Sequence, residues 1–143
     1  MSVPPSGASP HAAEQLPIEF FRRVWTPPHD LDAIDDLMVE DYAITTGGVV
    51  VRGREPFKRW VAAFQQRLLG ATNETLEVFA NAAGDRVVSR WVCRGRNNGI
   101  FDLPPDGREV AFTGIAIWRV RDGRLAECWV ERAAWEAYRA LAG

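Results

Sequence analysis

The chain has 143 residues, a hydrophobic fraction of 47%, a charged fraction of 25% and a formal net charge of −2. This length suits a single domain that buries about two-thirds of its unfolded surface. Arginines alternate with acids and form no basic face, and no apolar run reaches the roughly 20 residues of a membrane span. The start also lacks the pattern of a secretory signal. We therefore expect a cytoplasmic protein that binds neither nucleic acid nor membranes.

The N-terminal part of the chain is predicted to be helical. Its Pro-, Ser- and Gly-containing start predicts a flexible tail over residues 1–12, followed by one domain over residues 13–143. Apolar residues at helical spacing predict a helix that begins at Pro17 and ends before Thr26. Asp30 is placed to cap a short second helix.

The central part is predicted to alternate between strand and helix. Residues 41–51 read as two short strands joined at a pair of glycines. A third helix is predicted between Gly53 and Gly70. Its apolar stripe consists of Phe57, Trp60, Val61, Phe64 and Leu68.

The C-terminal part is predicted to be a meander of long strands. Val, Ile, Trp and Phe are frequent in four segments that turn residues separate, namely 75–81, 86–97, 110–120 and 124–131. Residues 134–141 are predicted to form a closing helix. Helices followed by an antiparallel meander indicate the α+β class, with helices on one face of a curved sheet.

An ordered series of short motifs resembles the SnoaL-like polyketide cyclase family of the NTF2-like superfamily. The series runs from about residue 17 to the end and comprises Asp41-Tyr42, Gly53-Arg54-Glu55, Phe57, Gly84-Asp85-Arg86-Val87, Gly95, Gly99, Phe101, Pro104-Pro105, Gly107-Arg108, Arg119, Asp122-Gly123, Glu127 and Trp129. The resemblance implies a homodimeric NTF2-like cone, in which N-terminal helices pack on a strongly curved antiparallel sheet. It also implies cofactor-independent cyclisation of an apolar or aromatic polyketide intermediate in antibiotic biosynthesis. Relatives of hydroxylase type, which would work with a partner reductase, are the alternative.

The positions at which the resemblance places acid/base side chains carry other residues here. The aspartate of the cyclases corresponds to Val130, and a histidine and a glutamine correspond to Ala116 and Gly114. An asparagine of the family corresponds to Ile44, and a histidine of the broader family to Cys128. The chemistry of the cyclases therefore does not transfer residue by residue.

Histidine, cysteine and metal chemistry are not favoured by the sequence. The only histidines, His11 and His29, lie outside the predicted strands, so these strands offer no imidazole base and no His-based metal site. Cys93 and Cys128 are expected to be buried, reduced thiols, because one strand of the meander separates them. We expect no metal and no cofactor.

Strand alternation separates an apolar face from a face that carries arginines and glutamates. On the apolar face small residues lie among aromatic ones, which predicts an apolar pocket for a flat ligand. The alternative is that Trp60 or Phe64 fills the gap and leaves a packed core. The candidate substrate-binding residues are Ile44, Trp60, Phe64, Trp91, Phe112, Gly114, Ala116, Trp118, Cys128 and Val130.

Glu131 and Tyr42 are the candidate catalytic residues. Regular alternation points Glu131 away from the pocket, but a bulge near Trp129 would turn it inward, where desolvation would suit it to acid/base catalysis. Tyr42 either directs its hydroxyl into the pocket or is a half-buried strand tyrosine. The opposite face, with Ile115 and Ile117, is expected to be a dimer interface. Without catalysis, the same pocket would make the protein a binding module for a hydrophobic metabolite.

Overall fold

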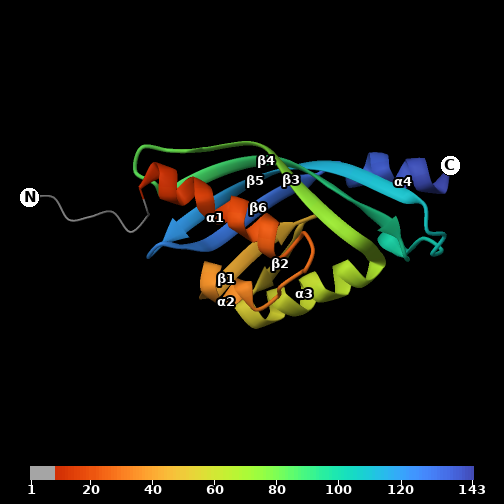
Figure 1. The fold of residues 1–143 in the computed structure, drawn as a ribbon, viewed down its shortest axis with the longest axis horizontal. Coiled ribbons are helices and arrows are strands. Elements are labelled where there is room, and N and C mark those ends of the chain that lie inside the picture. Colours follow the sequence, from red (N-terminus) through yellow and green to blue (C-terminus); the bar gives the residue numbers. More distant parts are fainter. Residues whose placement is uncertain (1–8) are drawn as a thin grey trace, which may run out of the picture.

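Within residues 9–143, which the computed structural model describes, four α-helices pack on a six-stranded sheet (Figure 1). The helices are α1 (Pro10–Arg23), α2 (Ala33–Leu37), α3 (Arg54–Arg67) and α4 (Ala134–Ala142). The strands are β1 (Met38–Thr46), β2 (Val49–Arg52), β3 (Leu68–Ala80), β4 (Arg86–Asn97), β5 (Glu109–Arg121) and β6 (Arg124–Arg132). This arrangement confirms the predicted α+β class.

The sheet is open, with the strand order β2-β1-β6-β5-β4-β3. β1 runs parallel to β6, with Ile44 beside Cys128, whereas the other neighbouring pairs are antiparallel. A parallel pair requires a long connection, which α3 and strands β3–β5 provide here. The sheet is therefore mixed at one junction, which alternation within single strands does not reveal.

Three of the four strands of the predicted meander match closely, whereas β3 begins at Leu68 and not at residue 75 as predicted. β4 covers residues 86–97 as predicted, and β5 and β6 differ by only a residue at their ends. The turn between β5 and β6 consists of Asp122 and Gly123, with φ angles of 55° and 74°. Positive φ at both central residues is the geometry of a type I′ hairpin, which an Asp-Gly pair between two strands favours.

The first helix begins earlier than predicted. Ser9 caps α1 by accepting a hydrogen bond from a backbone N–H of its first turn, and Pro10 occupies that turn. The predicted start at Pro17 is therefore wrong. Proline lacks the N–H that a helix interior uses, so it is usually a start signal, yet α1 continues through it. Of the tail predicted over residues 1–12, residues 1–8 lie outside the described part of the chain.

Two further helix boundaries differ from the prediction. Asp32 immediately precedes α2, and the Asp30 carboxylate instead accepts a hydrogen bond of 3.1 Å from the Asp32 N–H, which closes a turn before the helix. α3 ends at Arg67, so Gly70 does not terminate it. Gly70 lies in β3 with a φ of 63°, where the register with β4 shifts and the edge strand bulges.

The strands arch over α1 and α3, which cover what we call the inner face of the sheet (Figure 1). Burial alternates strictly along most of β5, as the sequence predicts. α4 is the exception to the expected one-sided arrangement. It packs against β5 on the opposite, outer face, beside Val92 and Thr113.

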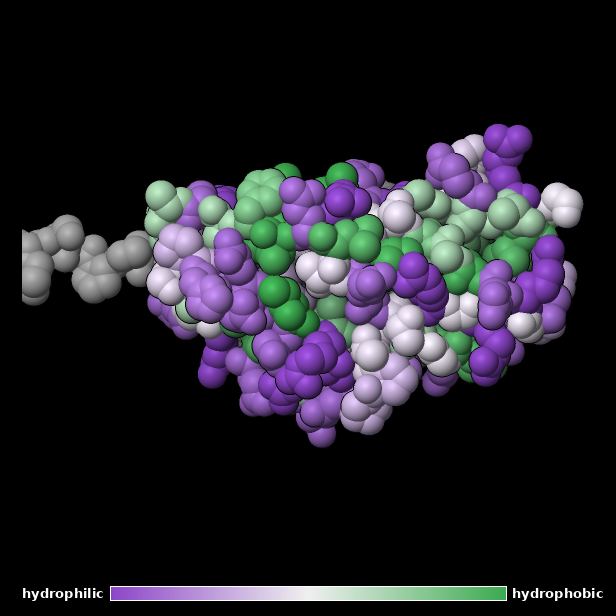
Figure 2. All heavy atoms as spheres, turned by 45° about the horizontal axis from the view of Figure 1, so that its top comes forward, coloured by the Kyte–Doolittle hydropathy of each residue, from purple (hydrophilic) through white to green (hydrophobic). Residues whose placement is uncertain are grey.

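The outer face keeps several large apolar side chains in solvent. Ile115, Ile117 and Trp129 are 50%, 45% and 38% exposed. Beside them Arg119 and Glu127 form a cross-strand ion pair of 3.3 Å. Across one side of the molecule, Figure 2 shows hydrophobic atoms in a broken band among hydrophilic ones. No helix in residues 9–143 has both the length and the apolar character to cross a membrane.

Candidate functional site

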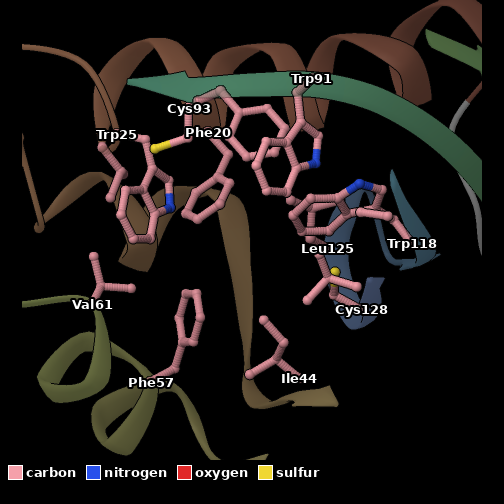
Figure 3. Close-up of a cluster of buried hydrophobic side chains, with 14 of the residues drawn as sticks. Phe20, Trp25, Ile44, Phe57, Val61, Trp91, Cys93, Trp118, Leu125 and Cys128 are labelled. Atoms are coloured by element: carbon pink, nitrogen blue, oxygen red, sulfur yellow. The ribbon is translucent and has the colours of Figure 1, made fainter. Parts of the chain in front are cut away.

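A cavity with aromatic walls lies between the inner face of the sheet, α1 and α3. Figure 3 shows Trp91 and Trp118 directed from the strands toward Phe20, while Phe57 and Ile44 approach from the opposite side. Of the predicted residues, the cavity is lined by Tyr42, Ile44, Trp60, Phe64, Trp91, Phe112, Ala116, Trp118, Cys128 and Val130. The lining also includes residues that were not predicted, namely Phe20, Phe21, Trp25, Phe57, Asn73, Cys93 and Arg132.

The aromatic rings leave little free space between them. Phe57 and Trp60 stack at 6.0 Å between ring centroids, and the ring of Phe64 lies 5.4 Å from that of Trp25. The space that the centre of a water-sized sphere can occupy in this cavity is about 50 Å³. Such a volume holds a few water molecules at most. Trp60 and Phe64 thus fill much of the predicted gap, although a cavity remains.

Gly114 does not make room for a ligand, contrary to the prediction. A Cβ atom at this position would lie 2.3 Å from the Trp91 ring, so the indole already occupies the space. Gly114 is accordingly not among the cavity-lining residues. Its role is to let the Trp91 ring approach the backbone of β5, which no larger residue permits.

Tyr42 is fully buried at the cavity wall, with its ring 4.8 Å from that of Phe57. This excludes the half-buried alternative. Its hydroxyl lies beside the Cys128 thiol, a weak partner, and has no oxygen or nitrogen partner among the described residues. Burial raises the pKa of Tyr42 well above its ordinary value of 10.0, so the hydroxyl stays neutral and is available as a donor.

Glu131 lies outside the cavity. The pairing of β5 with β6 is regular from Gly114–Arg132 to Arg119–Glu127, so the bulge near Trp129 that would turn Glu131 inward is absent. Its side chain is exposed on the outer face. The basis for Glu131 as a catalytic acid/base in the pocket is therefore wrong.

Arg132 is the charged residue that β6 brings to the cavity. It shares the inner face with Cys128 and Val130, because residues two apart on a strand point the same way. Its guanidinium lies 5.3 Å from the Trp60 ring centroid and 5.4 Å from that of Phe64, and it donates a hydrogen bond of 2.5 Å to the Thr46 hydroxyl. Extending the predicted strand by one residue would have identified it.

A wider groove lies on the solvent side of these residues. It has a volume of about 330 Å³ and is lined by Thr46, Arg67, Phe101 and Glu131, among others. Trp60, Phe64 and Arg132 line both the groove and the inner cavity. These three side chains therefore form the partition between the two spaces.

The two cysteines are free, buried thiols, as predicted. Cys93 on β4 and Cys128 on β6 are separated by β5. Burial raises the pKa of Cys93 to about 12 and that of Cys128 further still. Neutral thiols are poor nucleophiles, so both act as apolar lining.

The architecture is that of the NTF2-like α+β cone, and comparison with known proteins agrees. A SnoaL-like domain matches residues 18–128, and the chain belongs to this family. A candidate SnoaL-like polyketide cyclase from Jannaschia sp. CCS1 superposes with a TM-score of 0.84 at 17% identity, over 94% of each chain. No curated protein matches the chain at a significant level.

Two other solved structures show how varied the described activities are on this fold. IdmH from Streptomyces antibioticus, a candidate polyketide cyclase, has a TM-score of 0.78 at 23% identity, over 92% of this chain and 99% of its own. AclR from Streptomyces galilaeus, a candidate hydroxylase, has a TM-score of 0.80 at 18% identity, over 94% and 98%. Such identities show a shared fold, and the reaction has to be argued from the site.

Proposed function

We propose that the protein is a polyketide-tailoring enzyme of SnoaL-like type that closes a ring in an apolar or aromatic polyketide intermediate without a cofactor. The observation that carries this proposal is the aromatic cavity, with the buried Tyr42 hydroxyl in its wall. Aromatic walls with few polar groups suit a planar, conjugated ligand. The family supplies the type of reaction.

Ring closure in such a site depends mainly on positioning. Two carbons of one chain must be held in contact, and a rigid, dry cavity lowers the entropic part of that barrier. The carbon between two carbonyls loses its proton to water, the resulting enolate carbon attacks the second carbonyl, and the oxygen of that carbonyl takes up a proton to become a hydroxyl. Tyr42 donates a hydrogen bond to this oxygen as it gains charge. Among the described lining residues there is no carboxylate or imidazole, so the protein does not supply a conventional general base.

Entry of a ligand requires Trp60 and Phe64 to turn aside. Both side chains are only partly buried, in contrast to Phe57 and Val61 on the same helix. Exposed and half-exposed side chains change rotamer within nanoseconds, so this movement does not need a change of the backbone. The groove outside the partition then adds the volume that the inner cavity lacks.

A non-catalytic binding module is the second candidate function. The lack of an acid/base side chain among the described lining residues favours it directly. In this case the cavity and groove would carry or shield a hydrophobic metabolite. A hydroxylase working with a partner reductase is a third possibility, to which the similarity to AclR gives some weight.

The proposal is tested with a panel of aromatic β-keto esters, each incubated with the protein and analysed by mass spectrometry. We expect a cyclised product, and we expect Tyr42→Phe to slow its formation on the order of 100-fold because a donor to the developing oxyanion is lost. Tyr138→Phe on α4 is the matched control, since it removes a hydroxyl far from the cavity lining. Binding without any product would favour the binding module.

We also propose that the protein is a homodimer that associates through the outer face. Burial of Ile115, Ile117 and Trp129 in an interface would remove the exposed apolar surface described above. Sedimentation analysis of wild type and of Ile117→Lys tests this, because a charge at the interface should shift the protein toward monomer. A cytoplasmic location stays a prediction.

A further inference from the structure

The guanidinium of Arg132 occupies an unusual environment for a cation. It lies against the faces of two aromatic rings, those of Trp60 and Phe64, and its neighbours on the inner face include the thiols of Cys93 and Cys128. Burial lowers the pKa of Arg132, but a guanidinium remains protonated at any ordinary pH. The protein therefore keeps a full positive charge at the cavity wall.

No acid balances this charge among the described residues. The arginine–carboxylate pairs within 4.0 Å, such as Arg119–Glu127 and Arg121–Asp41, lie elsewhere. Glu131 borders the same groove, but its exposed side chain forms no ion pair with Arg132. Holding a desolvated charge without a counter-ion costs free energy, and stacking on aromatic faces offsets only part of it. An anion that belongs to a bound ligand would supply the missing counter-charge.

The hydrogen-bonding capacity of Arg132 supports the same conclusion. A guanidinium has five N–H donors, and the Thr46 hydroxyl is the one acceptor that Arg132 reaches within the described residues. The remaining donors lie at the partition between the inner cavity and the outer groove, which both include Arg132 in their walls. A ligand that spans the partition passes directly beside them.

We propose that Arg132 binds an oxyanion of the ligand, while the planar apolar part of that ligand stacks against Trp60 and Phe64. The ligand class is thus an aromatic or conjugated molecule with one anionic oxygen group at its edge. This inference rests on the proposed function, since it requires that the cavity and groove take up an apolar ligand. It also gives the inner cavity, whose described lining has no carboxylate, a fixed positive charge that stabilises an enolate.

Two kinds of oxyanion fit this site, a carboxylate and the ionised oxygen of an acidic enol. Both accept hydrogen bonds from a guanidinium in its plane. They are distinguished with two pairs of probes that differ mainly in charge. The first pair is 2-naphthoate and 2-naphthamide, and the second is ionised 2-hydroxy-1,4-naphthoquinone and its neutral 2-methoxy ether.

Calorimetric titration of the four probes into the wild-type protein is the first experiment. We expect at least one anion to bind about 10-fold to 100-fold more tightly than its neutral partner, which is the range for a hydrogen bond to a charged group. The pair that shows the difference identifies the kind of oxyanion. Equal affinity within both pairs would overturn the role of Arg132 and leave the proposed function intact, whereas no binding of any probe would contradict both.

Two variants then test whether Arg132 causes the tighter binding of the anion. Arg132→Gln should abolish the preference for the anion and leave the affinity of the neutral probe within about 2-fold, and Arg132→Lys should restore part of it because the charge returns without the planar donors. Arg59→Gln on α3 is the matched control, with the same change of charge at an exposed site. A preference that persists in Arg132→Gln would sink the proposal. If Arg132→Gln does not fold, the wild-type and Arg132→Lys measurements decide it.

Discussion

The inner and outer faces of strands β4–β6 are built from alternate residues of the same segments, yet they differ in almost every physical respect. On the inner face Trp118 is 2% exposed, and its indole N–H donates to the Ser89 hydroxyl at 3.0 Å. On the outer face Trp129 is 38% exposed. The two tryptophans are close neighbours on adjacent strands, since Trp118 pairs with Cys128 and Trp129 is the next residue of that strand.

The difference between the faces concerns charge as well as burial. Outer-face charges occur in solvated pairs such as Arg119–Glu127, with both side chains partly exposed. Inner-face groups are either kept neutral by burial, as are Tyr42 and the two thiols, or left without a counter-ion, as is Arg132. The outer-face charges are thus paired within the chain, whereas the Arg132 guanidinium on the inner face has no carboxylate partner among residues 9–143.

The strongest test of this comparison is to truncate each tryptophan. Trp118→Ala should lower the free energy of unfolding by about 3–5 kcal/mol, because it removes a buried ring and leaves a cavity. Trp129→Ala should lower it by less than about 1 kcal/mol, since much of the ring is already in solvent. Urea denaturation at low protein concentration measures both values.

The Trp129 result also sharpens the dimer proposal. If Trp129→Ala costs little in dilute solution but several-fold more at high protein concentration, then association buries the outer face. Equal losses for the two tryptophans at every concentration would contradict the assignment of inner and outer faces.

Alkaline pH should weaken the inner face selectively. The thiols ionise near their ordinary value of 9.0 in the unfolded chain, whereas folding raises the pKa of Cys93 to about 12 and that of Cys128 also upward. The folded state therefore binds these protons more tightly than the unfolded chain does. The free energy of unfolding that this difference contributes is fully present below pH 9 and is lost as the pH rises from 9 toward the pKa of the folded state. Between pH 8 and 10 the expected loss is on the order of 1 kcal/mol for each thiol.

The control for this loss is the double variant Cys93→Ala, Cys128→Ala. Its free energy of unfolding should fall less over the same pH range, as urea denaturation at each pH would show. An identical decline in wild type and double variant would mean that other titrating groups, such as Lys58 in its pair with Asp35 or the buried Tyr42, govern alkaline stability.

The smallest expected effects are those of replacing two arginines, which should change the free energy of unfolding in opposite directions. Arg132→Met should raise the free energy of unfolding by about 1 kcal/mol, because it removes a largely buried charge without a partner. Arg119→Met should lower it by about 0.2–1 kcal/mol, because it breaks a half-exposed ion pair. Thermal unfolding of the three proteins without ligand is sufficient, and a loss of stability in Arg132→Met would show that the charge is already balanced.

The sequence was sufficient to predict the strands and their faces, for reasons that are local. The alternation along β4 and β5 and the Asp122-Gly123 turn are set by neighbouring residues. The start of β3 was missed because Thr72 and Asn73 are polar and lie on an edge strand with a bulge. The parallel pairing of β1 with β6 depends on contacts between distant segments, which no local pattern records.

In the candidate site, too, some features follow from neighbouring residues and others depend on contacts between distant segments. The aromatic lining of the strands followed from alternation, and most of the predicted residues do line the cavity. Whether space remained between them depended on how side chains from α1 and α3 fill it, as the contact of Trp91 with Gly114 illustrates. Arg132 was missed because the predicted strand stopped one residue short, although its side chain follows the same period.

The parallel junction between β1 and β6 has a consequence for the way the chain folds during synthesis. β1 provides Tyr42 and Ile44, but the strand beside it, with Cys128 and Val130, is synthesised only after α3 and strands β2–β5. Until then the aromatic side chains of α1 and α3 lack the wall that shields them from water. Such late, non-local closure makes folding slow and exposes an aggregation-prone surface. We therefore expect the pairing of β1 with β6 to be a late step of folding.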